Sequence, residues 1–291
     1  MRYAQVFPGQ GSQFVGMGKE LFDNYEEAKK RFLEANKILG FQITQVMFEG
    51  NKEELKETNI AQPAIFIHSI IKSKLSKVKG KLFGVAGHSL GEFSALVASN
   101  SISFKDGLEL VKIRANEMKK ACEVNPGTMA AVIGLDNKIV ENCCLKIKEV
   151  VVPANYNCPG QIVVSGEKKA IVNLTRLLNE NGARKVIPLN VGGAFHSPLM
   201  FSAKKELENY IQKIEFKKPS CPIYQNCVGK GVSSIDEIKK NLVNQLTSPV
   251  LWTQSINQMT NDGINNFVEV GPGKVLQGLI KKINPNVNVD L

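Results

Sequence analysis

A serine between two glycines is the residue in this sequence best suited to covalent chemistry. It stands in Gly87-His88-Ser89-Leu90-Gly91, between the apolar run 82–86 and the helix-like stretch 92–98. A strand, a Gly-x-Ser-x-Gly turn and a helix in this order are typical of a nucleophile elbow, which exposes the serine hydroxyl. Glycines suit the turn because a side chain beside a strained serine would clash. An ordinary tight turn is the alternative, but the flanking strand and helix favour a nucleophile.

A serine nucleophile needs a base at neutral pH, and the chain has three histidines. His68 lies in an apolar stretch, and we expect it in the core with its hydrogen bonds satisfied. His88 adjoins Ser89, and neighbouring side chains at a sharp turn diverge. His196 lies in the glycine-flanked loop 191–198, and a serine followed later by a histidine is the order in α/β hydrolases. We therefore expect His196 to be the base, although no carboxylate between Ser89 and His196 stands out to orient it.

The helix expected over residues 105–121 carries an arginine on its apolar side. At about 100° per residue, one arc of the helix collects Leu110, Val111, Met118 and Ala121. Arg114 falls inside this arc, whereas Glu117 lies at its edge. Burying a charge is costly unless an opposite charge meets it, so Arg114 either forms a structural ion pair or binds a carboxylate or phosphate of a substrate. With the serine and the base, it indicates acyl transfer from an acyl group that carries an anion.

Composition excludes several classes of function. The 291 residues are 43% hydrophobic and 22% charged, which allows a sizeable core in one or two domains. No apolar run reaches the roughly 20 residues of a membrane helix, and residues 1–8 are typical of a buried strand rather than a signal peptide. We therefore expect a cytoplasmic protein that does not bind membranes. The six cysteines include no Cys-x-x-Cys pair, which predicts reduced thiols and no metal site.

The net charge of +10 comes mostly from lysines spread along the chain. No basic run is interleaved with aromatic residues, and no nucleic-acid-binding motif is present. A solvated basic surface is one interpretation. The other is attraction of an anionic substrate or an acidic protein partner.

The order of the expected elements predicts an α/β fold in which one domain is inserted into another. The first part has a strand near residues 3–7, helices over 19–39 and 61–77, and the serine turn. Short strands and helices then alternate in the order βαββαβ, which is typical of a ferredoxin-like unit. The expected strands cover 128–133, 150–155, 161–165 and 184–188, and the helices cover 136–147 and 168–181.

Long helices then return, over 198–213, 234–247 and 251–261, before a strand at 266–270. This strand and its Gly-Pro-Gly turn match the first part of the chain by pattern. We therefore expect an α/β hydrolase-like large domain, with a parallel sheet and the nucleophile elbow, made of residues 1–123 and 197–291. Residues 124–196 would form the inserted ferredoxin-like (α+β) small domain.

Two polar loops are candidates for lining a site. The loop 8–13 follows the first strand, where α/β proteins place binding groups, and it contains Gln10. The stretch 155–161 is expected to be a hairpin loop first and a site-lining loop second.

Together these segments resemble the malonyl-CoA:acyl carrier protein transacylases of type II fatty acid synthesis over essentially the whole chain. The resemblance rests on Pro8–Gln13, Gln62-Pro63-Ala64, Gly87–Gly91, Arg114, Asn155–Gln161, Ala194–Ser197, Gln245 before Pro249-Val250, and Glu269–Lys274. One variation is Cys158, where a serine is common in the family.

The resemblance implies a ping-pong reaction in which Ser89 carries the malonyl group as an ester and His196 is the base. In the family a backbone carbonyl orients the histidine, here that of Gln245, so no carboxylate is needed. The backbone N–H groups of Gln10 and Leu90 would form the oxyanion hole.

The resemblance also implies how the substrate is recognised. Arg114 would pair with the malonyl carboxylate, and Met118, Gln62 and Asn157 would line the pocket. The substrates would be malonyl-CoA and an acidic acyl carrier protein, which would give the positive charge of the chain a partner. No cofactor would be required, and we expect a monomer.

Two other functions are compatible with part of the pattern. A serine hydrolase, such as a lipase or thioesterase, would share Ser89 and His196 but has no need of Arg114 on a buried face. A non-catalytic scaffold that binds carrier proteins would tolerate loss of the serine and the histidine, and both are present.

Overall fold

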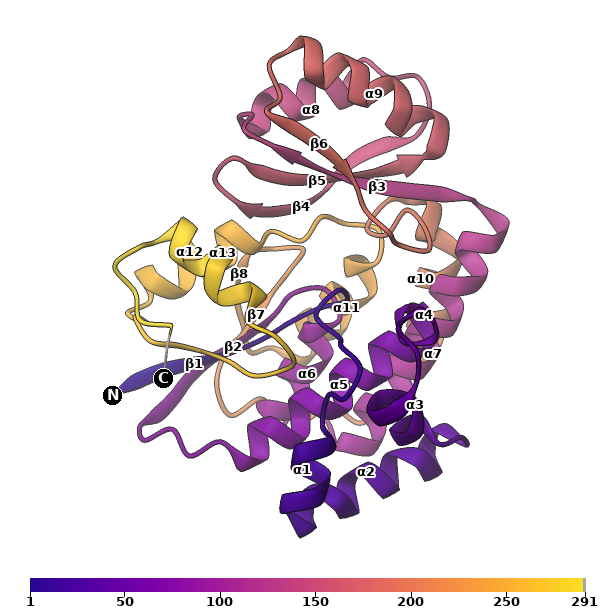
Figure 1. The fold of residues 1–291 in the computed structure, drawn as a ribbon. Coiled ribbons are helices and arrows are strands. Elements are labelled where there is room, and N and C mark those ends of the chain that lie inside the picture. Colours follow the sequence, from indigo (N-terminus) through magenta and orange to yellow (C-terminus); the bar gives the residue numbers. More distant parts are fainter. Residues whose placement is uncertain (290–291) are drawn as a thin grey trace.

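Two separate β-sheets organise the computed structural model, which describes residues 1–289 (Figure 1). The larger sheet has the strand order β8-β7-β2-β1-β9. Its strands are β1 (Arg2–Phe7), β2 (Lys81–Gly87), β7 (Ile223–Gln225), β8 (Lys230–Val232) and β9 (Phe267–Glu269). β1, β2, β7 and β9 run parallel, which confirms the predicted parallel sheet, and the edge strand β8 is antiparallel to β7.

The burial of β1 explains why a strand of this sheet could be predicted from the sequence. Five of its six residues are buried, as expected of a parallel strand covered on both faces. β7 and β8 have three residues each and were not predicted, because neither is followed by a turn signal such as the Gly-Pro-Gly that marked the equally short β9.

The helices that precede the second sheet pack partly on this sheet and partly on one another. They are α1 (Lys19–Asn24), α2 (Glu26–Leu39), α3 (Ile43–Glu49), α4 (Lys52–Lys56), α5 (Thr58–Leu75), α6 (Gly91–Ala98) and α7 (Phe104–Val124). The single helix expected over 19–39 is two helices, because Tyr25 has an extended backbone with φ −132° and ψ 111°. α3 and α4 were not predicted.

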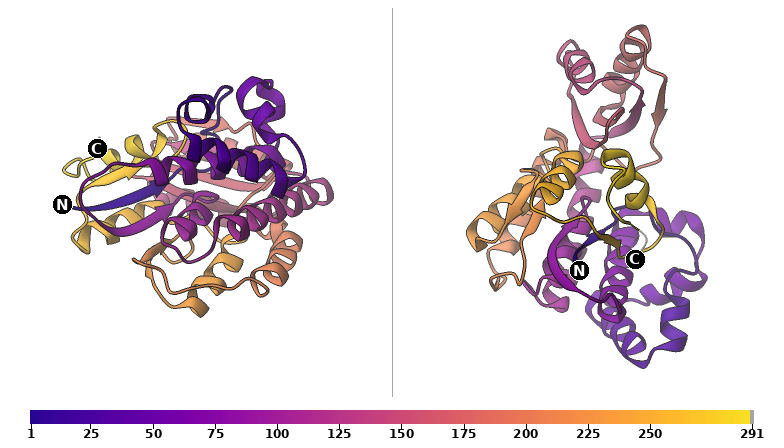
Figure 2. Two further views of the ribbon diagram at one scale, coloured as in Figure 1. Left: turned by 90° about the horizontal axis from the view of Figure 1, so that it is seen from below. Right: turned by 90° about the vertical axis from the view of Figure 1, so that its left-hand side faces the viewer.

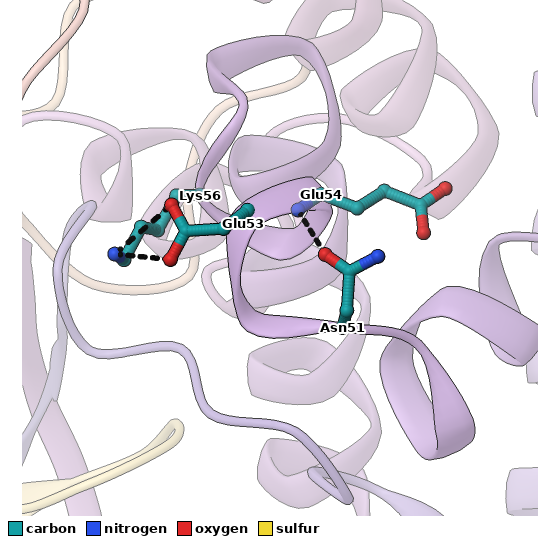
Figure 3. A network of polar contacts seen from close by, with 4 residues as sticks. All are labelled: Asn51, Glu53, Glu54 and Lys56. Carbon is teal, nitrogen blue, oxygen red and sulfur yellow. Dashed lines mark hydrogen bonds and ion pairs between the residues drawn. The ribbon is translucent and has the colours of Figure 1, made fainter.

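The short helix α4 begins with a side-chain cap, shown in Figure 3. The Oδ1 atom of Asn51 accepts a hydrogen bond from the backbone N–H of Glu54 at 2.8 Å. This satisfies one of the amides that the start of a helix leaves unpaired. Lys56 donates to the Glu53 carboxylate at 3.0 Å on the same exposed turn. The cap therefore fixes the segment that leads directly into α5.

The helices of the last third agree with the predicted ranges to within a few residues. They are the short 3₁₀ helix η1 (Pro198–Met200), α10 (Phe201–Ile211), α11 (Ile235–Gln245), α12 (Trp252–Asn261) and α13 (Val275–Ile283). None of the helices in residues 1–289 is long and apolar enough to cross a membrane.

The second sheet is antiparallel, with the strand order β4-β5-β3-β6. Its strands are β3 (Gly127–Ile133), β4 (Val151–Cys158), β5 (Gln161–Glu167) and β6 (Lys185–Pro188), and its helices are α8 (Asn137–Leu145) and α9 (Lys168–Glu180). The chain order is the predicted βαββαβ. Figures 1 and 2 show α8 and α9 on the face that points away from the five-stranded sheet. The exact domain boundaries, at 123/124 and 196/197, stay a prediction.

The two faces of the second sheet take part in different cores. Ala130, Val132, Ile162 and Val164 pack in a cluster with residues of α8 and α9. The alternate residues Met129, Ala131 and Val163 belong to the main core, together with residues of α5, α6 and α7. Successive side chains in a strand point to opposite faces, so this sheet presents one face to its own helices and the other to the rest of the molecule.

Candidate active site

The serine turn joins the end of β2 to the start of α6. Ser89 has a φ of 52°, in the left-handed region that a serine rarely adopts. A Cβ atom at Gly87 would overlap the backbone of Gly91, and one at Gly91 would overlap the backbone oxygen of Phe7. Both glycines are therefore required by the close approach of the backbone segments, as expected of a nucleophile elbow.

The hydroxyl of Ser89 faces the ring of His196. Ser89 Oγ lies 2.8 Å from His196 Nε2, and His196 Nδ1 lies 2.9 Å from the backbone oxygen of Gln245. A carbonyl oxygen only accepts hydrogen bonds, so Nδ1 carries the proton and Nε2 is free to accept from the serine hydroxyl. The backbone oxygen at the end of α11 thus selects the tautomer that a general base needs.

His196 is 3% exposed, and its surroundings keep it neutral. Burial and the nearby charge of Arg114 together lower its pKa to about 3, while the bond to Gln245 opposes the shift. The imidazole of His196 is therefore unprotonated at any pH near neutrality.

The other two histidines do not contact the serine hydroxyl. His88 Nε2 lies 2.9 Å from Asn157 Oδ1, and its ring lies 5.6 Å from that of Trp252. His68 is a core residue, as expected, with 7% exposure, and burial lowers its pKa to about 4. The expectation that its hydrogen bonds are satisfied is wrong for one atom, because Nδ1 has no partner within residues 1–289.

Arg114 reaches the same serine from α7. It is 1% exposed, and its Nη2 donates to Ser89 Oγ at 3.1 Å and to Gln245 Oε1 at 3.1 Å. Nη1 donates to Gln62 Oε1 at 2.7 Å. Burial lowers the pKa of Arg114 to about 10, which still leaves it charged at neutral pH. The predicted inward arginine thus points a positive charge at the hydroxyl of Ser89.

The alternative of a structural ion pair for Arg114 has no support in the structure. No carboxylate of residues 1–289 lies within ion-pair distance of its guanidinium. Its direct partners are neutral oxygens, and its Nε has none in the same part of the chain. A buried cation held by neutral groups has capacity for an anion that enters the site.

The sequence analysis missed a buried carboxylate, which is linked to Arg114 through the side chain of Gln245. Glu92, in the first turn of α6, is fully buried and accepts hydrogen bonds at both oxygens. Oε1 accepts from Gln225 Nε2 at 3.0 Å, and Oε2 accepts from the Asn226 N–H at 2.8 Å and from Gln245 Nε2 at 3.2 Å. Burial raises the pKa of Glu92 to about 7, and these donors and Arg114 oppose the shift. Three donors and no acceptor suit the ionised carboxylate.

Asn226 and Gln245 connect Glu92 to the backbone of the serine turn 87–91. Asn226 Oδ1 accepts the N–H of Ser89 at 2.7 Å, and Asn226 Nδ2 donates to the oxygen of Gly87 at 2.7 Å. Gln245 Nε2 also donates to the oxygen of Ser89 at 2.9 Å. The strained backbone at Ser89 is therefore held by side chains from two distant segments.

Two backbone amides beside the serine have no acceptor. The N–H groups of Gln10 and Leu90 donate no hydrogen bond to residues 1–289, although the side chain of Gln10 contacts Thr58 at 3.3 Å. Both residues line the same cavity as Ser89. Such amides can stabilise negative charge that develops on an oxygen in the cavity.

The cavity has a volume of about 320 Å³. Its wall brings together most of the predicted site residues, namely Gln10, Gln62, Ser89, Leu90, Arg114, Met118, Asn157 and His196. Gln62 also contacts Met118, with Nε2 at 3.5 Å from the sulfur. Gln245 is fully buried behind the wall and acts on the site through its hydrogen bonds.

Comparison with known proteins agrees with this geometry. The acyl transferase domain family matches residues 4–287. The malonyl CoA-acyl carrier protein transacylase of Bacillus subtilis is 42% identical over 287 residues, which cover 97% of this chain and 90% of that protein. The chain belongs to the malonyl-CoA:acyl carrier protein transacylase family.

Solved structures of this family have the same fold. An acyl carrier protein S-malonyltransferase from Vibrio cholerae superimposes with a TM-score of 0.95 at 37% identity, covering 99% of this chain and 96% of that one. A malonyl-transacylase in complex with a type II PKS acyl-carrier protein also gives a TM-score of 0.95, at 36% identity, covering 99% and 95%.

Within this family site, sequence reasoning missed Glu92 and Asn226. A signal for Glu92 was present, because it is an acidic residue that opens the apolar stretch 93–97, much as Arg114 interrupts an apolar arc. Asn226 had no such signal, since it follows a strand too short to be recognised.

The low pKa of His196 predicts how Ser89 reactivity depends on pH. A base with a depressed pKa stays neutral as the pH falls through the ordinary histidine range. We expect the rate of Ser89 labelling by a fluorophosphonate to stay nearly constant from pH about 8 to about 5. The rate is measured by mass spectrometry, with Ser89→Ala as the unlabelled control. A half-maximal rate near pH 6.5 would contradict the depressed pKa.

Glu92→Gln tests the buried network. The new amide sets an –NH₂ group against N–H donors and leaves one of them unpaired, so we expect a loss of about 1–3 kcal/mol in the free energy of unfolding. Denaturation by urea measures it. The matched control is Glu180→Gln at an exposed position, which we expect to change stability by less than about 0.5 kcal/mol. Equal stability of the two variants would show that Glu92 does not organise the site.

Proposed function

We propose that this chain transfers the malonyl group of malonyl-CoA to the phosphopantetheine thiol of an acyl carrier protein, by a ping-pong mechanism through a malonyl-Ser89 ester. The single observation that carries the proposal is the contact of a buried, unneutralised Arg114 with the nucleophilic oxygen. A serine hydrolase would need the serine and its base. The arginine is explained by an acyl group with its own carboxylate, as in the substrate named for the relatives.

In the proposed first half-reaction, Ser89 Oγ attacks the thioester carbonyl carbon while His196 Nε2 takes the hydroxyl proton. The carbonyl oxygen becomes negative and is stabilised by the N–H groups of Gln10 and Leu90. The carbon–sulfur bond then breaks, and His196 returns the proton to the sulfur of coenzyme A. The malonyl group remains on Ser89 as an ester.

The second half-reaction uses the same atoms in reverse order. The carrier thiol gives its proton to His196 and attacks the ester carbonyl, and the Ser89 oxygen leaves and recovers the proton. His196 therefore alternates between base and acid, and the bond from its Nδ1 to Gln245 holds the ring in place throughout. The reaction needs no cofactor.

Arg114 supplies the selectivity of the proposed reaction. The planar guanidinium can hold a carboxylate by two parallel hydrogen bonds, in place of neutral partners such as Gln62. Met118, Gln62 and Asn157 would then surround the malonyl group within the cavity.

The proposal extends to the architecture and the partner. We assign the elbow and its sheet to an α/β hydrolase-like domain of residues 1–123 and 197–291, and residues 124–196 to an inserted ferredoxin-like domain. The net charge of +10 favours an acidic carrier. We expect a cytoplasmic monomer.

Mass spectrometry of the protein mixed with malonyl-CoA tests the reaction. We expect a malonyl adduct on the peptide that contains Ser89, and its transfer to holo acyl carrier protein when that is added. Ser89→Ala is the control and should remain unmodified. Rapid release of free malonate without transfer would favour the hydrolase, and the absence of any adduct would favour the scaffold.

Arg114→Ala tests whether Arg114 binds the substrate carboxylate or is needed for acyl transfer in general. Removing one partner of a buried charge pair costs about 2–5 kcal/mol, so kcat/KM for malonyl-CoA should fall by at least about 30-fold. Transfer of an acetyl group, which has no carboxylate, should be spared or improved. Both acyl donors are measured with the same variant, and an equal loss of kcat/KM for the two would refute the role of Arg114 in binding the carboxylate.

A further inference from the structure

Two buried side chains of opposite charge contact the same amide group, that of Gln245. Gln245 Oε1 accepts a hydrogen bond from Arg114 Nη2 at 3.1 Å, and Gln245 Nε2 donates to Glu92 Oε2 at 3.2 Å. Arg114 is 1% exposed and Glu92 is fully buried, and none of the ion pairs formed by residues 1–289 includes either of them. A neutral amide therefore separates a buried cation from a buried anion.

Glu92 is held in this position by donors other than Arg114. Its Oε1 accepts from Gln225 Nε2 at 3.0 Å, and its Oε2 accepts from the N–H of Asn226 at 2.8 Å. Gln225 is itself fixed, because its Oε1 accepts from Asn241 Nδ2 at 2.9 Å and its Nε2 also donates to the oxygen of Ile238 at 3.2 Å. Glu92 therefore cannot move into contact with the guanidinium without giving up these bonds.

The two charges act on one another across the amide. Water screens buried charges only weakly, so a buried pair that is not in contact still interacts. Burial raises the pKa of Glu92 and lowers that of Arg114, and the charge of each residue opposes the shift of the other. An anion that binds Arg114 from the cavity would be attracted by the guanidinium and repelled by the carboxylate of Glu92.

We propose that Glu92 sets how tightly Arg114 holds the carboxylate of the acyl group, by lowering the affinity of the site for that carboxylate. This inference rests on the proposed function. Glu92 is a positioning residue in this role, because it acts through Gln245 and Arg114 and does not touch the substrate.

A moderate affinity suits a group that has to leave again. In the proposed reaction, the malonyl group stays in the cavity through both half-reactions and then departs on the carrier protein. Binding that is equally tight in the ground state and the transition state lowers KM without raising kcat. A stronger hold on the carboxylate would therefore retain the product without making the acyl transfer faster.

Binding of monomethyl malonate, a half ester with one free carboxylate, tests the proposal. It is measured as protection of Ser89 from fluorophosphonate labelling at pH about 8.5, where Glu92, with a pKa of about 7, is ionised. Glu92→Gln keeps the size of the side chain and removes its charge, and we expect it to bind the half ester about 5- to 10-fold more tightly than the wild type. Dimethyl malonate, which has no carboxylate, should bind both proteins equally.

Glu92→Asp is the matched control, because it keeps the charge and disturbs the hydrogen bonds. We expect this variant to gain no affinity for the half ester. A merely structural role of Glu92 predicts that both variants bind the half ester more weakly than the wild type. The proposal is overturned if Glu92→Gln binds no more tightly than the wild type, or if Glu92→Asp gains the same affinity.

The wild-type protein separates failure of this proposal from failure of the proposed function. If the fluorophosphonate labels wild-type Ser89 and the half ester gives no protection, Arg114 does not bind an acyl carboxylate, and both proposals are overturned. If the half ester protects the wild type and the two Glu92 variants behave alike, only the role of Glu92 is overturned. In transfer assays, the KM of Glu92→Gln for malonyl-CoA should fall while kcat does not rise.

Discussion

The buried positive charge of Arg114 is the constraint on which the rest of the site depends. Its guanidinium lies among neutral oxygens of Gln62, Gln245 and Ser89, and it has no carboxylate at ion-pair distance within residues 1–289. The nearest compensation that the contacts define is Glu92, which reaches the arginine only through the amide of Gln245. A full internal ion pair would satisfy the arginine and remove its capacity for an entering anion. The intervening amide stabilises the cation while leaving it available.

The same amide and carboxylate connect segments that are far apart in the chain. Glu92 holds the residues that follow β7, and through Asn226 it holds the backbone of Ser89. Gln245 holds the histidine with its backbone and the serine with its side chain. The mutual geometry of Ser89 and His196 is therefore not a property of the turn at 87–91 alone, because it also depends on the ends of β7 and α11.

The sequence predicted those features that leave a local or periodic signal. The elbow was recognisable from its glycines and the flanking strand and helix, and Arg114 from its place on a helical wheel. The division into two sheets followed from the change to short alternating elements after residue 126. β7, β8 and Asn226 could not be found in this way, because their contacts are made by tertiary pairing of very short segments. The hairpin predicted at 155–161 is present, but its turn is confined to residues 159–160. Pairing with Val163 and Val250 extends β4 beyond its predicted end at residue 155 to Cys158.

The depressed basicity of His196 has a consequence for the order of events. Part of the depression comes from the field of Arg114, which opposes a second positive charge nearby. In the proposed reaction, the carboxylate of the bound malonyl group cancels much of that field. The imidazole then becomes a stronger proton acceptor when the cognate acyl group occupies the cavity and a weaker one when water alone reaches the serine. The charge of the substrate thus helps to activate the base that acts on it, and an uncharged acyl group meets a less reactive serine.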